Sequence, residues 1–139
     1  MDNGSASDWG HPHPSDLLFA YGTLKKGGAY HHLIAEKEAE FVGKACTCLA
    51  YPLLLAEYPC LLDRPGDGFR VKGEVYRLPS LAAWEVVDWL EDHPKEYRRR
   101  PEAVEMEGAI LKPWTYFYLW PQRLDPRLQP VEGFDVNPG

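Results

Sequence analysis

The apolar run Leu17–Tyr21 breaks abruptly at Gly22, and this break restricts the fold more than any other feature of the chain. An uninterrupted hydrophobic run of this length, bounded by a turn signal, predicts a short buried strand. The stretch that follows, Tyr21-Gly22-Thr23-Leu24, is the start of a polar, glycine-containing segment with two lysines and two histidines. Successive backbone N–H groups in such a turn can bind an anion. We therefore predict a binding turn directly after a core strand.

The rest of the chain alternates between strand and helix patterns. Residues 69–76 alternate apolar and polar side chains with the period of a half-buried strand. Ser80 precedes an apolar run that stops at Pro94, which predicts an N-capped helix over 80–93. The other expected elements are a helix at 30–38 and strands within 40–54, interrupted at Pro52, and at 99–106 and 115–120. Several strands with two modest helices predict an α+β domain and fit a small barrel.

The two ends of the chain lack hydrophobic periodicity. Residues 1–15 are rich in Gly, Ser, Asp and Pro, and we expect them to form a flexible N-terminal tail. Residues 16–125 are expected to form one domain, because no repeat and no second domain is visible. Residues 126–139 contain several Pro and Gly and are expected to form a C-terminal tail on the surface.

Composition and charge restrict the classes of partner. The chain is 45% hydrophobic and 26% charged, which is ordinary for a soluble globular protein. Its net charge of −6 argues against nucleic acid as a partner, because phosphates require a basic surface. The basic run Arg98-Arg99-Arg100 is interpreted as a solvated edge. No apolar run reaches the roughly 20 residues of a membrane span, and no secretory signal is visible, so we expect no membrane partner and a cytoplasmic location.

Residues able to bind a metal are scattered. Cys46, Cys48 and Cys60 form a small odd set, which suits reduced thiols. The pair Cys46-x-Cys48 lacks a second pair at zinc spacing, so we interpret both as small buried hydrophobic residues. His11 and His13 lie in the tail without partners, and the sequence predicts no metal site and no cofactor.

The helix predicted over 80–93 has two carboxylates on a face that is otherwise apolar. Asp88 and Glu91 share a broad arc with Trp84 and Val87. Because Trp89 is apolar too, we expect this helix to be covered on more than one side. Burial raises the pKa of a glutamate toward the range that suits general acid–base catalysis. The alternative is that Asp88 and Glu91 pair with arginines or extend into solvent.

Four segments together resemble the γ-glutamylcyclotransferase-like superfamily, and within it most of all the γ-glutamylamine cyclotransferase branch. They are FAYGTLKKG, YPLLL, LLDRPGDGFRVKGEVYRL and VVDWLEDHPKEYRRR. The resemblance covers roughly Leu17 to Met106, and YFY at 116–118 matches a later strand. The YGTL turn alone would be a weak signal. Its combination with VKGEVY and DWLEDHPKEYRR at these distances is specific.

The resemblance implies a small mixed β-barrel flanked by α-helices, with a cavity at one mouth. It implies that Tyr21, Gly22, Thr23 and Leu24 form the substrate-binding turn and that Glu91 is the catalytic acid/base. Because Pro94 ends the helix and the chain then returns toward the sheet, we expect the phenol of Tyr97 near Glu91, in the same site. Asp88 matches a frequent aspartate of the family whose role stays open. Asp92 and His93 directly follow the glutamate, where many relatives carry a small residue, and their roles also stay open.

The implied reaction needs only the substrate's own groups and a carboxylate. The α-amine of a γ-glutamyl amine or peptide attacks its own γ-carbonyl, which yields 5-oxoproline and a free amine, while Glu91 takes and returns a proton. The expected partner is therefore a small-molecule γ-glutamyl substrate, and the expected assembly is a monomer or weak dimer. A non-catalytic binding or regulatory module with the same cavity is the alternative, because a shared fold does not establish function.

Overall fold

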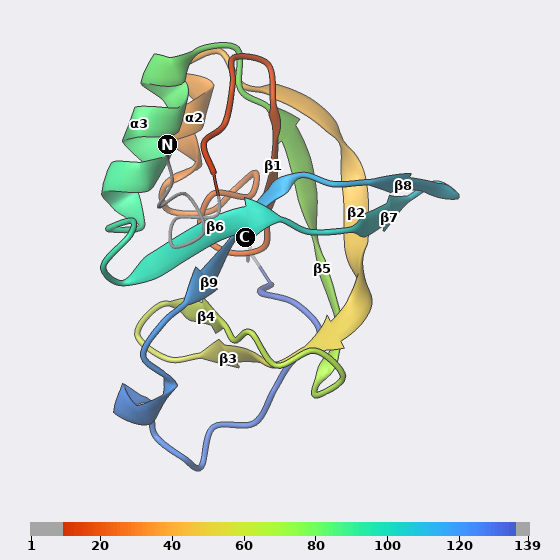
Figure 1. Ribbon diagram of the computed structural model, residues 1–139, viewed down its shortest axis with the longest axis vertical. Helices are drawn as coiled ribbons and strands as arrows, with labels where there is room; N and C mark the ends of the chain where they lie inside the picture. The colour runs from red at the N-terminus through yellow and green to blue at the C-terminus, as the bar shows by residue number, and fades with distance from the viewer. Residues whose placement is uncertain (1–9, 136–139) are drawn as a thin grey trace.

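The seven-stranded sheet of the computed structural model, which describes residues 10–135, curls into a half-barrel (Figure 1). Its strand order is β6-β9-β1-β5-β2-β7-β8, and β1 pairs parallel with β9 but antiparallel with β5. The strands are β1 (Leu17–Ala20), β2 (Glu40–Tyr51), β5 (Phe69–Arg77), β6 (Tyr97–Pro101), β7 (Val104–Met106), β8 (Ala109–Leu111) and β9 (Trp114–Tyr118). The predicted mixed barrel is thereby confirmed as an α+β half-barrel.

Three smaller pieces complete the described fold. A two-stranded sheet of β3 (Leu53–Leu55) and β4 (Pro59–Leu61) lies below the large sheet in Figure 1. The helices α2 (His31–Ala35) and α3 (Leu81–Leu90) lie side by side on the other side of the fold. A short 3-10 helix, η1 (Pro121–Arg123), follows β9. None of the helices in residues 10–135 has the length and apolar content that a membrane crossing requires.

Strand β1 is buried because it contributes to two hydrophobic clusters, one on each face of the sheet. Leu18 and Ala20 pack in the cluster beneath α2 and α3. Phe19, and Tyr21 directly after the end of the strand, pack in the second cluster with residues of β3, β4 and β5. A strand that is covered on both faces requires an apolar run without alternation, and this confirms the predicted buried strand.

The predicted helices exist, but both are shorter than expected. The side-chain oxygen of Ser80 accepts a hydrogen bond from the N–H of Ala83 at 3.2 Å, which confirms the predicted N-cap of α3. The helix ends at Leu90, four residues before Pro94, because the backbone turns at Asp92, whose φ is +50°. Helix α2 ends at Ala35, and Glu38 has a φ of +63°.

The expectation that α3 is covered on several sides was wrong. Ala83, Trp84 and Val87 are buried against the sheet, whereas Trp89 is 75% exposed. At 100° per residue, Trp89 lies about 200° from Val87, on the opposite side of the helix. The sheet and α2 therefore cover one face of α3 only.

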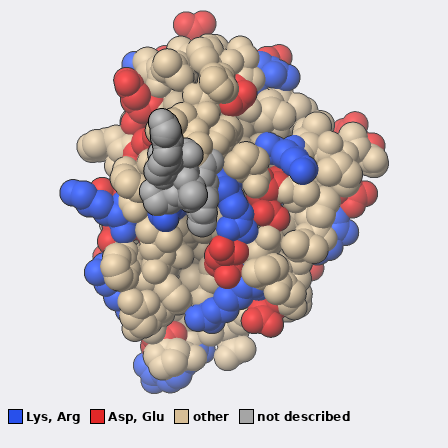
Figure 2. Space-filling model, viewed as in Figure 1, with Lys and Arg blue, Asp and Glu red and all other residues tan. Residues whose placement is uncertain are grey.

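The basic run on β6 is not a solvated edge, which corrects the interpretation of Arg98-Arg99-Arg100. Arg99 is only 4% exposed and Arg100 forms a two-point ion pair with Asp63, at 2.7 and 3.0 Å. The guanidinium of Arg99 pairs with Asp88 at the end of α3, and that of Arg100 lies 4.2 Å from the ring centre of Phe117. On the face seen in Figure 2, Lys and Arg are interspersed with Asp and Glu.

The described parts of both predicted tails contact the domain. The N–H of Ser15 donates to the carbonyl of Leu78 at 2.7 Å. At the other end, the N–H of Val131 donates to the carbonyl of Leu53 at 3.0 Å, and Lys25 Nζ donates to the carbonyl of Phe134 at 2.6 Å. Residues 1–9 and 136–139 lie outside the described residues, and the flexibility expected of the tails stays a prediction.

The two tryptophans of α3 provide a matched test of this packing. We expect Trp84→Ala to lower the free energy of unfolding by about 3–5 kcal/mol, because it removes a fully buried side chain. Trp89→Ala on the exposed face should change it by less than about 0.5 kcal/mol. Urea denaturation followed by circular dichroism measures both values. Equal losses for the two variants would contradict the one-sided burial of α3.

Candidate active site

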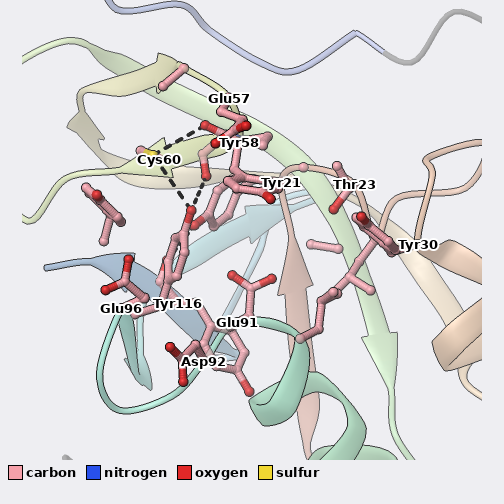
Figure 3. A pocket seen from close by; sticks show the side chains of 18 of the residues that line it. Tyr21, Thr23, Tyr30, Glu57, Tyr58, Cys60, Glu91, Asp92, Glu96 and Tyr116 are labelled. Atoms are coloured by element: carbon pink, nitrogen blue, oxygen red, sulfur yellow. Dashed lines mark hydrogen bonds between the residues drawn. The ribbon is translucent and has the colours of Figure 1, made fainter. Parts of the chain in front are cut away.

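A cavity of about 660 Å³ opens where β1, the end of α3 and the loop after β9 meet (Figure 3). The residues predicted for the site all line it: Tyr21, Gly22, Thr23, Leu24, Glu91 and Tyr97. Further lining residues that the sequence analysis did not identify are Tyr30, Glu57, Tyr58, Cys60, Tyr116, Tyr118 and Arg123. The fold therefore brings together segments that are far apart in the sequence.

The turn after β1 leaves its amide groups available to the cavity. The carbonyls of Gly22 and Thr23 accept hydrogen bonds from the N–H groups of Lys25 (3.1 Å) and Tyr30 (3.0 Å), so the turn is closed on one side. Among the described residues, no acceptor takes a hydrogen bond from the N–H of Gly22, Thr23 or Leu24. Unsatisfied N–H groups beside a cavity form the kind of concavity that binds a carboxylate.

At Gly22 the turn packs closely against Pro59, which leaves little space for a side chain. A Cβ atom on Gly22 would lie 3.0 Å from Cγ of Pro59, on the segment that faces the turn across the cavity wall. A contact of that length forces the proline ring or the turn to move. The absence of a side chain at this position therefore keeps the turn against β4.

Glu91 forms the C-cap of α3 and directs its carboxylate into the cavity, toward the side where Tyr21 and Thr23 lie (Figure 3). Burial, reinforced by the charge of Asp88, raises the pKa of Glu91 from 4.5 to about 7. The last turn of α3 contains no basic residue that would offset the negative end of the helix dipole. Within residues 10–135, no hydrogen-bond donor or cation pairs with this carboxylate. Glu91 is therefore a carboxylate poised to exchange a proton near neutral pH.

Asp88, in contrast, is paired. Its Oδ1 accepts hydrogen bonds from Arg99 Nε (2.9 Å) and from the hydroxyl of Tyr116 (2.5 Å), and its Oδ2 accepts one from Arg99 Nη2 (3.0 Å). The alternative that the helix carboxylates pair with arginine is thus correct for Asp88. The carboxylate of Asp88 therefore serves as the hydrogen-bond acceptor for both side chains.

Three buried tyrosines around the cavity donate their hydroxyl groups to other protein atoms. The hydroxyl of Tyr21 donates to the carbonyl of Tyr116 at 2.7 Å, and that of Tyr97 donates to the carbonyl of Pro59 at 2.9 Å. The third, Tyr116, donates to Asp88. Burial raises the pKa of each of them and of the Cys60 thiol, which lies 3.7 Å from the Tyr97 hydroxyl. All four groups are therefore neutral near pH 7.

The outer part of the cavity is more polar. Arg123 pairs with Glu96 at 3.1 Å, and its guanidinium lies 4.3 Å from the ring centre of Trp120. Asp92 is exposed at the rim, whereas His93 is half-buried beside Tyr116. Tyr116 and Tyr118 are two residues apart on one strand, so their shared orientation was a signal available in the sequence. Arg123 lies in a segment without any recognisable pattern.

Comparisons with known proteins agree with this architecture. The sequence profile described as "Gamma-glutamyl cyclotransferase, AIG2-like" matches residues 18–135. A protein from Drosophila melanogaster is 37% identical over 106 residues, which cover 71% of this chain and 67% of the relative. Gamma-glutamylaminecyclotransferase B from Danio rerio is 43% identical over 89 residues, which cover 60% of this chain but only 46% of the relative.

The fold is shared as well. The crystal structure of an AIG2-like protein from Mus musculus superimposes with a TM-score of 0.78 at 29% identity, and the match covers 89% of this chain and 90% of that chain. The chain therefore belongs to the gamma-glutamyl cyclotransferase, AIG2-like family. The roles of individual residues in the cavity stay predictions.

The raised pKa of Glu91 makes stability depend on pH in a defined direction. Between pH 4.5 and pH 7 the unfolded chain releases this proton while the folded protein retains it, so folding becomes less favourable as the pH rises. Glu91→Gln removes this effect. Relative to the parent, the variant should gain up to about 3 kcal/mol in free energy of unfolding between pH 4.5 and pH 7.5.

Urea denaturation at several pH values measures this difference. Glu85→Gln, an exposed position on the same helix, is the matched control and should differ from the parent by a constant amount. A stability difference between Glu91→Gln and the parent that does not change with pH would show that Glu91 titrates normally.

Proposed function

We propose that this protein is a γ-glutamyl cyclotransferase that releases 5-oxoproline and a free amine from a γ-glutamyl amine or γ-glutamyl peptide, with Glu91 as general acid/base. One observation carries the proposal: Glu91 is an unpaired carboxylate, in the described part of the chain, with a pKa raised to about 7, and it faces a cavity beside a turn with free amides. The name gamma-glutamylaminecyclotransferase of the Danio rerio relative supports the substrate class.

The free amides of the turn provide a site for the substrate's α-carboxylate. Hydrogen bonds from the N–H groups of Gly22, Thr23 and Leu24 to a carboxylate are charge-assisted and stronger than those between neutral groups. A γ-glutamyl group held there by its α-carboxylate has its α-amine next to the anchoring point. The amine is then within the cavity that Glu91 faces.

The reaction requires two protons to leave the attacking nitrogen. Glu91 in its ionised form takes the first proton from the α-ammonium group, and the neutral amine attacks the γ-carbonyl carbon to close a five-membered ring. The protonated Glu91 gives this proton to the amide nitrogen, the bond between carbon and nitrogen breaks, and the amine leaves; the ionised Glu91 then takes the second proton from the ring nitrogen and passes it to the departing amine. Holding the chain in a folded geometry provides much of the rate enhancement, because both reacting groups belong to one molecule.

Glu91 is the group best suited to this role among the titratable residues of the described cavity. The tyrosines Tyr21, Tyr97 and Tyr116 already donate their hydroxyls to protein acceptors. The Cys60 thiol has a raised pKa and is neutral near pH 7. A base that changes its protonation near the working pH is the most effective catalyst of proton transfer.

Turnover by Glu91→Gln tests the proposal directly. The amide is nearly the same size as the acid but cannot exchange a proton, so we expect the rate of 5-oxoproline release to fall by about 100- to 10,000-fold. The measurement uses a panel of γ-glutamyl amines and γ-glutamyl peptides, with 5-oxoproline quantified by mass spectrometry. Glu85→Gln on the exposed side of α3 is the control and should keep the parent rate.

Two outcomes would contradict the proposal. Equal cyclisation rates in Glu91→Gln and the parent would exclude Glu91 as the acid/base. Binding of γ-glutamyl compounds by the parent without any 5-oxoproline release would favour the non-catalytic binding module.

A second variant tests the turn. Gly22→Ala places a methyl group 3.0 Å from Pro59 and must displace the turn or the ring. Losing one charge-assisted hydrogen bond of about 1.5 kcal/mol raises KM about tenfold, while kcat should change little. Steady-state kinetics on the best substrate of the panel measures both. Gly133→Ala is the control, because its methyl group would meet Lys72 at an ordinary 3.4 Å; an unchanged KM in Gly22→Ala would exclude the turn as the binding element.

A further inference from the structure

Arg99 and Tyr116 are directly opposite each other in the antiparallel pair of β6 and β9. Cross-strand partners present their side chains on the same face of a sheet, and here that face lies beneath α3. Both side chains donate to one carboxylate, that of Asp88 in the last turn of α3. The register of β6 and β9 therefore places three hydrogen-bond donors, two from Arg99 and one from Tyr116, around the carboxylate of Asp88. We call this arrangement the socket.

This socket is rigid and partly buried. The side chain of Arg99 is 5% exposed and that of Asp88 is 25% exposed. The remaining guanidinium nitrogen Nη1 donates to the carbonyl of Gly10 at 2.8 Å, and the guanidinium carbon lies 5.3 Å from the ring centre of Trp114. A bidentate arginine–carboxylate pair with these supports fixes orientation as well as distance.

Tyr116 joins this socket to the substrate turn. Its hydroxyl donates to Asp88, while its backbone carbonyl accepts the hydroxyl of Tyr21, the first residue of the turn. Asp88 is three residues before Glu91, so both lie on the same side of the last turn of α3. One continuous set of hydrogen bonds thus connects the helix end that carries Glu91 with the turn proposed to hold the substrate.

We propose that Asp88, held by Arg99 and Tyr116, is a positioning residue that fixes the last turn of α3 and orients Glu91 toward the substrate; this inference rests on the proposed function. Asp88 is not among the residues that line the cavity. Its effect reaches the reaction through Glu91, first by geometry and second by its negative charge, which favours the protonated form of its neighbour.

The other titratable groups near Asp88 and Glu91 do not replace this effect. Burial and the charge of Arg99 lower the pKa of His93, so this side chain is neutral near pH 7. The neutral groups Tyr21, Cys60 and Tyr97 line the same cavity as Glu91, and so do the carboxylates of Asp92 and Glu96.

Asp88→Asn tests the proposal, because it keeps the shape but removes the charge and replaces one acceptor by a donor. We expect kcat to fall about 10- to 100-fold with a KM change below about threefold, since small displacements of a catalytic group have effects of that size. The midpoint of the acidic limb of the pH profile for kcat/KM should move to lower pH, because loss of the Asp88 charge lowers the pKa of Glu91. Tyr116→Phe should lower kcat but leave this midpoint in place, since the Asp88 charge remains.

The matched control is Asp63→Asn. Asp63 forms the equivalent two-point ion pair with Arg100, the next residue of β6, and it does not line the cavity. We expect it to lower stability without changing kcat or the pH midpoint. Asp88→Asn with the parent's kcat and midpoint, or Asp63→Asn with the same changes as Asp88→Asn, would overturn the positioning role. If Asp88→Asn does not fold, Tyr116→Phe decides, and a parent-like kcat in that variant overturns the role.

A readout independent of turnover separates this proposal from the proposed function. The Glu91 carboxyl carbon is titrated by ¹³C NMR in the parent and in Asp88→Asn, with Glu91→Gln used for assignment. A midpoint that moves to lower pH in Asp88→Asn supports the coupling of the two residues even if no γ-glutamyl compound is turned over, which would contradict the proposed function alone. An unchanged midpoint overturns the coupling, whatever the turnover.

Discussion

The curvature of the seven-stranded sheet is the constraint on which the site depends. The long pair of β2 and β5 contains register shifts between Phe41 and Gly43 and between Cys46 and Ala50, and such irregularities bend a strand and increase its twist. Gly73 on β5 allows the backbone of β1 to approach closely, because a Cβ atom at position 73 would lie 2.6 Å from the carbonyl oxygen of Ala20. In a flat sheet the end of β1 would lie far from β4. The cavity would then lose the wall that β4 forms opposite the turn after β1.

The curled sheet also explains how a carboxylate without a partner can be kept inside the fold. The helix α3 is fixed at its first turn by the Ser80 cap and along its length by the burial of Trp84 and Val87. Its last turn is fixed by the ion pair of Asp88 with Arg99. Each of these interactions stabilises the helix while Glu91 itself is destabilised by burial. The cost of one buried ionisable group is small beside the packing of a whole helix.

Local patterns were sufficient to predict some elements and insufficient for others. The buried strand β1, its turn and the Ser80 cap depend on neighbouring residues, so the sequence predicted them. The exposure of Trp89 was predicted wrongly, because α3 has apolar residues on all sides and only the position of the sheet decides which are covered. The contact of Arg99 with Asp88 depends on the register of β6 and β9, which no local pattern specifies. Cys46 and Cys48, expected to be buried, are half-exposed because they alternate along β2 with Ala45 and Thr47, which occupy the buried face.

The raised pKa of Glu91 has a quantitative consequence for the proposed reaction. An α-amino group has a pKa of about 8 and an ordinary glutamate one of about 4.3, so moving the proton from the ammonium to such a glutamate costs roughly 5 kcal/mol. With a pKa of about 7 the same step costs only on the order of 1 kcal/mol. The difference, roughly 4 kcal/mol, corresponds to a factor of hundreds in the population of the reactive amine. Burial of Glu91 and the fixed charge of Asp88 thus act in the same direction, because both favour the form of Glu91 that has accepted the proton.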